Sequence, residues 1–285
     1  MEALFLSIIT INYNNAAGLR KTLESVRSQT SKNYEHIIID GGSTDESIAV
    51  LEEFLADKDY AMQVTYWCSE KDRGIYDAMN KGIPHANGRY CLFLNSGDYL
   101  ADNEVVARFD QYNLTDTIIY TNIIFYNSKK EWKVKYPSKI TLDYFYQRQT
   151  LSHQNTLFLT NYMKEHPYSL KYKIAGDVDI YWQALCREGI NFTYIDDVIS
   201  KYEHEFGLST IAATKEIRNR EWKMQIDEYI PDPIIRDVLE NNARMRKELA
   251  VYEKCYHGIL VKLKNILLKY SAIKKRIIAR ESERH

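Results

Sequence analysis

The sequence predicts an α/β fold, in which a mostly parallel β-sheet is flanked by helices and followed by a helical C-terminal extension. Strand-like apolar runs alternate with helical patterns over the first hundred residues, and three of the runs end in polar clusters. Strands that alternate with helices of this length form right-handed β-α-β units, which build a parallel sheet. From about residue 215 the pattern is helical, with Pro231 and Pro233 separating two pieces.

The first half contains four predicted strands and the helices that connect them. Residues 4–11 read LFLSIITI, an unbroken apolar run of strand length. Leu19, Leu23 and Val26 then recur at helical spacing. Ser43 and Glu46 have the spacing of a capping box, which predicts the start of the next helix. The remaining strands of this half are expected at 34–39, 64–67 and 90–94, with a helix over 75–86 before the last.

The second half is richer in β-branched and aromatic residues. Residues 117–126 and 132–136 flank a polar turn, a pattern typical of a hairpin. We expect a further strand at 156–159 and a helix that begins after Ala175-Gly176-Asp177. A short strand is expected at 192–195.

The length and composition limit the classes of protein to which this chain can belong. With 285 residues, 45% of them hydrophobic, the chain can bury a sizeable core. It holds no run of about 18 apolar residues that would span a membrane, and its N-terminus lacks the basic flank of a secretory signal. We therefore expect a cytoplasmic protein. The cysteines have neither disulfide nor zinc spacing and are expected to be reduced: Cys68, Cys91, Cys186 and Cys255.

Charge is distributed unevenly along the chain. Residues 254–285 hold nine Lys or Arg and two Glu, so this tail carries +7 although the whole chain carries −1. Its apolar residues recur at helical spacing between the lysines. Such a helix suits the surface of an anionic membrane, which would make the protein peripheral at the inner face of the cell membrane. Packing on the body or formation of a homodimer explains the pattern equally well. We expect no nucleic-acid partner.

The polar clusters that end three strands predict a ligand site. They lie at 12–15, 40–45 and 95–98, and the carboxyl ends of parallel strands meet at one edge of a sheet. The glycine loops of dinucleotide-binding proteins and of P-loop NTPases are both absent from the sequence. This argues against an ordinary dehydrogenase or NTPase. A phosphate bound here would be neutralised by Arg73 or by a divalent cation at Asp98.

Several segments in order resemble the motifs of the family 2 glycosyltransferases of the GT-A fold, of the bacterial polysaccharide-biosynthesis type. The segments are SIITINYNN, IIIDGGSTD, SEKDRGIYDAMNKGIPHANGRYCLFLNSGD, SHQNTLF, IAGDVDIYWQAL and FGLS, and they extend over residues 4–210. The resemblance implies a GT-A domain over 1–212, with a donor half at about 1–110 and an acceptor half at about 111–212. The helical extension then covers 213–285.

The resemblance also implies an activity. It is inverting, metal-dependent transfer of a hexosyl or N-acetylhexosaminyl group from a nucleotide sugar, with UDP as the expected nucleotide. The acceptor would be a hydroxyl of a growing surface polysaccharide or lipid-linked oligosaccharide, and Mn²⁺ or Mg²⁺ would bridge the diphosphate. The expected donor-binding residues are Thr10, Ile11, Tyr13, Asp40, Gly41, Arg73, Asn95 and Ser96.

This chain departs from the family pattern at the metal motif. Where the family usually shows Asp-x-Asp, this chain has Asn95-Ser96-Gly97 followed by Asp98, so one carboxylate remains. One carboxylate is enough for a hard cation when phosphates and waters supply the other oxygens. His204 is a second candidate ligand. The weakened motif also fits an alternative function, a catalytically weak nucleotide-sugar-binding or scaffolding subunit.

Asp177 matches the position of the family's catalytic base. Such a base takes the proton of the acceptor hydroxyl as that hydroxyl attacks the anomeric carbon. Asp179, two residues later, is the competing choice, although at the first turn of a helix it also favours the helix dipole. His153 and Gln154 are candidates for contacts with the donor or acceptor sugar. A histidine held in a buried hydrogen bond explains His153 equally well.

Overall fold

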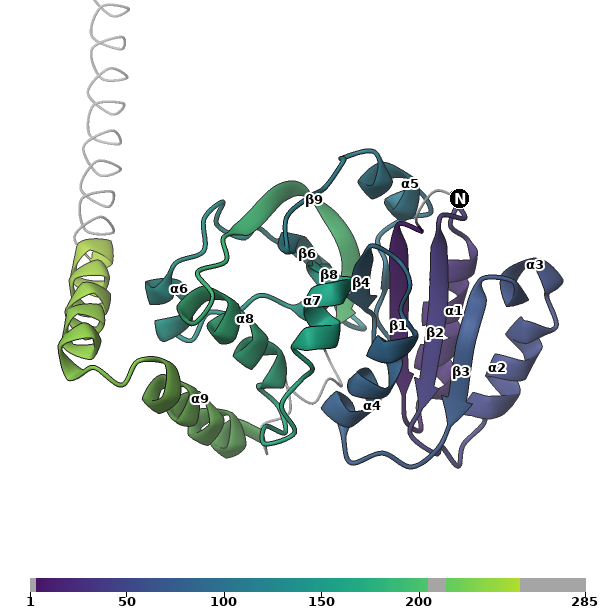
Figure 1. Cartoon of the computed structure of the whole chain (residues 1–285), viewed down its shortest axis with the longest axis horizontal. Coiled ribbons are helices and arrows are strands. Elements are labelled where there is room, and N and C mark those ends of the chain that lie inside the picture. The colour runs from purple at the N-terminus through teal and green to yellow at the C-terminus, as the bar shows by residue number, and fades with distance from the viewer. Residues whose placement is uncertain (1–3, 205–213, 252–285) are drawn as a thin grey trace, which may run out of the picture. The chain divides into compact units, whose positions relative to one another are not determined.

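The computed structural model describes residues 4–204 and 214–251, and in these residues nine strands form one sheet (Figure 1). The strand order is β3-β2-β1-β4-β8-β6-β9-β5, with β7 paired to β6. The strands are β1 Leu6–Asn12, β2 Tyr34–Asp40, β3 Val64–Ser69, β4 Tyr90–Phe93, β5 Tyr99–Leu100, β6 Ile118–Tyr126, β7 Glu131–Val134, β8 Thr156–Leu159 and β9 Phe192–Glu203.

The first four strands form the parallel part of the sheet. Strand β1 lies in the middle and pairs in parallel with β2 on one side and β4 on the other, while β3 extends the sheet beyond β2. The α/β architecture that the sequence predicts is confirmed, and each of the four predicted strands forms within three residues of its expected ends. Because these strands run in one direction, the residues that follow β1, β2 and β4 lie at the same edge.

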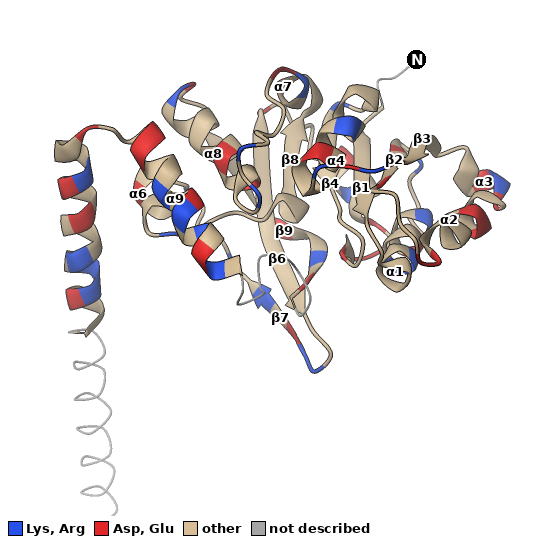
Figure 2. Ribbon diagram, turned by 90° about the horizontal axis from the view of Figure 1, so that it is seen from below, with Lys and Arg blue, Asp and Glu red and all other residues tan. Residues whose placement is uncertain are grey.

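Helices cover both faces of this parallel part (Figure 2). Helices α1 (Ala16–Arg27) and α2 (Ser47–Leu55) pack against each other and share an apolar cluster with Ile8 and Ile38. Helix α4 (Ile75–Gly82) contacts β1 and β2 from the other side, where Ile9 lies. Side chains alternate between the two faces of a strand, so the continuous apolar run of β1 supplies both layers.

Glycine at position 82 allows α4 to approach the sheet closely. A Cβ atom at Gly82 would lie 2.6 Å from Cγ2 of Ile9, which is nearer than carbon atoms approach without a shift of the helix. Further α-helices are α3 Lys58–Ala61, α5 Val105–Asp110, α6 Leu142–Tyr146, α7 Thr160–Glu165, α8 Gly176–Cys186 and α9 Lys215–Tyr229.

The second half extends the sheet with strands of mixed direction. Strand β8 is antiparallel to both β4 and β6, whereas β9 is parallel to β6. The predicted short strand at 192–195 is in fact β9, which continues to Glu203. Asp196 and Asp197 make this strand look interrupted in the sequence. Each has a cationic partner, Lys135 at 2.7 Å from Asp196 and Arg108 at 2.8 Å from Asp197, so the acids are accommodated within the strand.

The predicted capping box before α2 is wrong. Helix α2 begins at Ser47, and the side chain of the N-cap residue Glu46 makes no capping hydrogen bond. The hydroxyl of Ser43 instead donates a hydrogen bond to Asp40. Asp45 accepts a hydrogen bond from the backbone N–H of Ser47 at 3.0 Å. The buried carboxylate of Asp40 competes successfully for Ser43, because an ionised acceptor forms the stronger hydrogen bond.

The chain divides into two compact units after Pro231, and helix α9 belongs to the first unit. In the second unit, residues 233–251 are helical. No helix in the described residues is both long enough and apolar enough to span a bilayer. The basic tail at 254–285 lies outside the described residues, so its predicted amphipathic helix stays a prediction.

A buried histidine in the sheet gives a testable dependence of stability on pH. His36 is fully buried on β2, where its ring nitrogens lie 2.8 Å from the hydroxyl of Thr10 and 2.6 Å from that of Tyr60. Burial lowers the pKa of His36 to about 3 from its usual 6.5. Below pH 6.5 the unfolded chain therefore binds a proton that the folded chain does not, and stability falls as the pH falls.

We expect the free energy of unfolding to drop by about 1 kcal/mol between pH 7 and pH 5.5 because of this one histidine. Denaturant unfolding of the wild type and of His36→Asn at the two pH values measures the effect. The variant should be less stable than the wild type at pH 7, but its free energy of unfolding should change less with pH. An equal pH dependence in both proteins would contradict the assignment.

Candidate active site

A pocket of about 900 Å³ opens at the carboxyl ends of β1 and β4. This volume lies in the range of small-molecule binding sites. The strand ends contribute 11–13 and 95–98, except for Gly97. The second half contributes 152–154 and 202–204, and residues of α9 close one side. The structure thus brings the polar ends of two parallel strands together with residues that lie far along the chain.

The predicted site residues divide into two groups. Those that line the pocket are Ile11, Tyr13, Asn95, Ser96, Asp98, His153, Gln154, Asp177 and His204. Those that do not line it are Thr10, Asp40, Gly41, Arg73 and Asp179.

The loop after β4 has a backbone conformation that suits glycine better than an acid. Gly97 has φ of +105°, a backbone conformation that residues with a Cβ rarely adopt. An aspartate at position 97 would therefore be strained in this loop. The carboxylate is supplied one residue later, by Asp98.

The side chain of Asp98 is buried at the base of the pocket and is 3% exposed. Its Oδ1 accepts a hydrogen bond from the backbone N–H of Glu203 at 3.0 Å, and its Oδ2 accepts one from Nε2 of Gln154 at 2.8 Å. Burial raises the pKa of Asp98 to about 7, although both hydrogen bonds favour the ionised form. Gln154, a predicted sugar contact, thus orients the carboxylate of Asp98.

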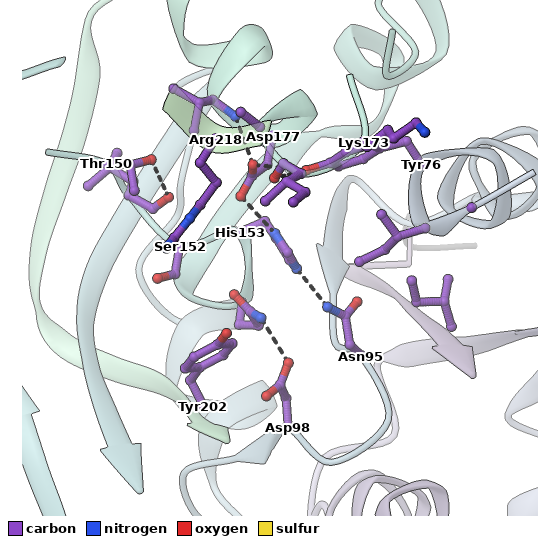
Figure 3. A pocket seen from close by; sticks show the side chains of 18 of the residues that line it. Tyr76, Asn95, Asp98, Thr150, Ser152, His153, Lys173, Asp177, Tyr202 and Arg218 are labelled. Atoms are coloured by element: carbon purple, nitrogen blue, oxygen red, sulfur yellow. Dashed lines mark hydrogen bonds and ion pairs between the residues drawn. The ribbon is translucent and has the colours of Figure 1, made fainter. Parts of the chain in front are cut away.

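A chain of polar contacts joins Asp177 to the strand-end loop (Figure 3). Oδ2 of Asp177 lies 3.2 Å from Nδ1 of His153, and Nε2 of His153 lies 3.1 Å from the amide nitrogen of Asn95. The tautomer consistent with both contacts carries its proton on Nδ1, donates to Asp177 and accepts from Asn95. This leaves Oδ1 of Asn95 buried without a partner among the described residues.

The other carboxylate oxygen of Asp177 contacts Tyr76. The Tyr76 hydroxyl lies 3.2 Å from Oδ1 of Asp177 and 2.6 Å from the carbonyl oxygen of Ile174. The ring fits there because residue 176 is glycine, where a Cβ would lie 2.8 Å from ring atoms of Tyr76. The Asp177 side chain is 17% exposed, so it is held in place yet reaches the pocket.

Asp179 is placed differently from Asp177, although both lie in the first turn of α8. Asp179 is 5% exposed and accepts a hydrogen bond from the hydroxyl of Tyr229 on α9 at 2.8 Å. Burial raises its pKa. Asp179 thus joins α8 to α9 and, unlike Asp177, does not line the pocket.

Asp40 ties together the ends of three strands. Its carboxylate is 1% exposed and accepts hydrogen bonds from Asn12 on β1 at 2.7 Å and from Ser69 on β3 at 2.6 Å. Burial opposes its ionisation, but the hydrogen bonds from Ser43, Ser69 and Asn12 outweigh burial, and the pKa of Asp40 lies below its usual value. The contact of Asp40 with a nucleotide base stays a prediction.

Two further predicted residues lie away from their expected partners. The guanidinium of Arg73 lies 2.8 Å from Asp77, and its side chain is 75% exposed. The structure therefore does not bring Arg73 to the pocket, because an acid one helical turn later holds it. His204 does line the pocket, but its ring packs against the aromatic rings of Phe125 and Trp132. The segment FGLS at 206–209 lies outside the described residues.

Helix α9 lines the pocket, although no pattern in its sequence predicts this. Glu221 on α9 is 2% exposed, and its carboxylate accepts the backbone N–H groups of Lys173, Ile174 and Ala175 at 2.7, 3.0 and 2.9 Å. These three residues immediately precede the turn that carries Asp177. Nε2 of Gln225, one helical turn after Glu221, donates to the carbonyl of Ala175 at 2.7 Å. Nothing in the charged sequence of α9 distinguishes Glu221 from a solvated acid.

One carboxylate and one amide oxygen, rather than a cluster of acids, are the candidate ligands for a metal ion. The described residues contain no group of three or more His, Cys, Asp or Glu that could hold a metal ion. Asp98 and Asn95 both line the pocket, and Oδ1 of Asn95 is buried without a partner among the described residues. Both are the oxygen ligands that Mg²⁺ and Mn²⁺ accept, in a site completed by phosphate and water.

The sequence is similar to those of known glycosyltransferases. The model of a family described as Glycosyl transferase family 2 matches residues 7–174, more than half of the chain. A PGL/p-HBAD biosynthesis glycosyltransferase of Mycobacterium tuberculosis is 27% identical over 224 residues, which cover 77% of this chain and 85% of that protein. An uncharacterised glycosyltransferase of the same organism is 45% identical over 104 residues, or 36% of this chain and 37% of that protein.

Solved structures are similar in fold. Residues 1–349 of TarS from S. aureus, in complex with UDP-GlcNAc, superpose with a TM-score of 0.62 at 18% identity, covering 82% of this chain and 70% of that chain. The mannosyltransferase PcManGT from Pyrobaculum calidifontis, in complex with GDP-Man and Mn²⁺, has a TM-score of 0.59 at 13% identity. The match covers 84% of this chain and 68% of that chain. The predicted GT-A fold class is confirmed. The match over residues 7–174 shows that the chain belongs to glycosyl transferase family 2.

Proposed function

We propose that this glycosyltransferase transfers a sugar, with inversion at the anomeric carbon, from a nucleotide sugar to a hydroxyl of a growing surface polysaccharide or lipid-linked oligosaccharide. UDP is the proposed nucleotide, and a hexosyl or N-acetylhexosaminyl group is the proposed sugar. The observation that carries the proposal is the carboxylate of Asp177, which lies in one pocket with Tyr13, Asn95 and Asp98 from the donor half. A single carboxylate at the acceptor hydroxyl is what an inverting transfer requires.

The contacts of Asp177 suit the work of a general base. His153 donates to one of its oxygens and Tyr76 contacts the other, so the carboxylate is held while part of it faces the pocket. The acceptor hydroxyl would give its proton to Asp177 as its oxygen attacks the anomeric carbon. In this proposal His153 is a positioning residue, because it acts through Asp177. Its second contact, with Asn95, links the base to the donor half.

A divalent cation fits the donor end of the pocket. We propose that Asp98 and Oδ1 of Asn95 hold it together with the oxygens of the donor, since both are oxygen ligands in the lining. When bound, Mn²⁺ or Mg²⁺ would stabilise the negative charge of the departing diphosphate. The PcManGT structure that contains GDP-Man and Mn²⁺, and the TarS structure that contains UDP-GlcNAc, support this choice of donor and cation.

Replacing Asp98 by Asn should weaken the binding of Mn²⁺ in the presence of UDP. We expect a loss of about tenfold or more, since even indirect partners of a metal contribute about 10- to 100-fold to affinity. Asn keeps the shape of Asp98 and an acceptor for the N–H of Glu203. Titration of Mn²⁺ followed by electron paramagnetic resonance measures the loss. UDP binding in EDTA is the control and should be equal in both proteins, whereas equal Mn²⁺ affinity would remove Asp98 from the site.

A second function, nucleotide-sugar binding without turnover, is favoured by one observation. The family's usual second acid is replaced by Gly97, and both oxygens of Asp98 already accept hydrogen bonds within the protein. A thermal-shift screen of nucleotide sugars with Mn²⁺ identifies the donor, because a ligand that binds only the folded state raises the unfolding temperature. Hydrolysis of that donor would support the enzyme. Stabilisation by the donor, with neither hydrolysis of the donor nor transfer to any acceptor tested, would support the binding subunit.

A further inference from the structure

Apart from Asp177, the charged residues that line the pocket are separated by sign. Besides Asp177, three acids line the pocket: Asp72 and Asp98 on the loops after β3 and β4, and Glu203 at the end of β9. The cationic side chains lie on the elements that surround Asp177. They are Arg148 after α6, Lys173 before α8, and Lys215 and Arg218 on α9. Figure 3 shows Lys173 and Arg218 at the end of the pocket that holds Asp177, with Asp98 at the other end.

Lys173 and Lys215 have no counter-ion within the described residues. Neither of them, nor Arg148, forms an ion pair there, whereas Lys171, two residues before Lys173, lies 2.5 Å from Glu228. Both lysines are exposed at the rim of the pocket. Their charges are therefore available to a ligand that enters from solution.

The backbone at Arg148 is unusual for an arginine. Arg148 has φ of +61° and follows the last turn of α6, where the N–H groups of Arg148 and Gln149 bond to the carbonyls of Phe145 and Tyr144. This is a helix C-cap that normally contains glycine, since other residues are strained there. Strained backbone of this kind is enriched at functional sites.

The guanidinium of Arg148 is fixed at the rim of the pocket. It lies 4.2 Å from the ring centre of Trp222 and donates one hydrogen bond, at 2.7 Å, to Oδ1 of Asn219. Both partners are neutral residues of α9 that also line the pocket. Since a guanidinium has five N–H donors, this arrangement orients the group and leaves donors for an anion.

We propose that the acceptor carries an anionic group, a phosphate or a carboxylate, which Arg148, Lys173 and Lys215 bind while its hydroxyl lies at Asp177. The inference rests on the proposed function. An inverting attack places the acceptor and the departing diphosphate on opposite sides of the anomeric carbon. The cations lie on the elements around the base, and the acids other than the base lie at the end where the diphosphate and its cation are proposed. The basic end therefore belongs to the acceptor.

Two kinds of acceptor have this chemistry, a lipid phosphate and a glycan that contains uronic acid. The test measures binding to the full-length chain saturated with UDP and Mn²⁺, so that the donor site is filled. The lipid pair of probes is octyl phosphate and neutral octyl glucoside, both below their micelle concentrations. The glycan pair is trigalacturonate and neutral maltotriose. Isothermal titration in about 50 mM salt, where screening is weak, gives each dissociation constant.

We expect one anionic probe to bind at least about fivefold more tightly than its neutral partner, because partly exposed charge pairs contribute about 1 kcal/mol. The pair that shows the preference identifies the source of the anion. Arg148→Gly and Lys173→Gln should each reduce that preference about threefold or more by the same reasoning. Arg148→Gly suits the cap geometry, so the chain should fold. Lys139→Gln removes an exposed lysine outside the pocket and should leave the preference unchanged.

Three results would overturn the inference. One is equal affinity for anionic and neutral probes in both pairs while UDP binds normally, which would leave the proposed function intact. Another is a loss of UDP affinity in Arg148→Gly and Lys173→Gln as large as the loss of probe affinity, which would assign the cations to the donor. The third is a wild-type chain that binds no UDP with Mn²⁺, which would reject the proposed function as well.

Discussion

Replacing Asp177 by Asn is expected to lower kcat for sugar transfer by about 10²- to 10⁴-fold, the contribution of a positioned general base. Asn preserves the size of the side chain and its contact with Tyr76, but it cannot take the proton of the acceptor hydroxyl. The dissociation constant of UDP with Mn²⁺ should stay near that of the wild type, because Asp98 and Asn95 are unchanged. Steady-state transfer kinetics together with UDP titration separate the two effects.

Asp179→Asn is the matched control for this prediction. Asp179 lies two residues later on the same helix, but it contacts Tyr229 and does not line the pocket. Its replacement should change the unfolding temperature more than kcat. If Asp179→Asn lost activity and Asp177→Asn retained it, the roles of the two acids would have to be exchanged.

The sequence was sufficient for the donor half of the fold and for the location of the pocket. Apolar runs bounded by polar clusters predict the parallel strands. The carboxyl ends of parallel strands lie at one edge of the sheet. Asn95, Asp98 and Tyr13 therefore lie in the pocket as expected. The choice of Asp177 came from motif resemblance, and the contacts of His153 and Tyr76 supply a physical reason for it.

Two predicted donor-binding residues do not line the pocket, and the same cause accounts for both. Arg73 and Asp40 are charged residues beside the expected site, but each meets a closer partner, Asp77 for the first and a set of hydroxyl and N–H donors for the second. Sequence position predicts which edge of the sheet a side chain reaches. It does not predict which of several nearby partners captures that side chain, because a hydrogen bond depends on differences of about 1 Å.

Helix α9 could not be recognised as part of the site for a related reason. Its exposed face is rich in charge, and Glu221 has the same local sequence context as a solvated acid. Its role depends on a contact with residues 173–175, nearly fifty positions earlier in the chain. Only the folded structure brings three backbone N–H groups to one carboxylate.

Glu221→Ala is expected to lower both stability and kcat, and it tests whether α9 holds the catalytic loop. The substitution leaves the N–H groups of Lys173, Ile174 and Ala175 without their acceptor, at a cost of about 3 kcal/mol in the free energy of unfolding. It also frees the loop that carries Asp177. A displacement of about 1 Å at a catalytic group lowers the rate about 10²-fold, so we expect a loss of that size in kcat.

The measurements are denaturant unfolding, transfer kinetics and UDP titration on the same variant, compared with Glu216→Ala. Glu216 is an exposed acid in the first turn of the same helix, so its replacement removes a similar side chain without removing the anchor. Glu221→Gln should keep part of the activity, because its amide oxygen still accepts hydrogen bonds whereas its amide nitrogen does not. UDP affinity should survive in all three variants, since the strand-end loops make no contact with Glu221 in the hydrogen bonds of the described residues. A Glu221→Ala chain with the kcat of the wild type would show that Tyr76 and His153 hold Asp177 without help from α9.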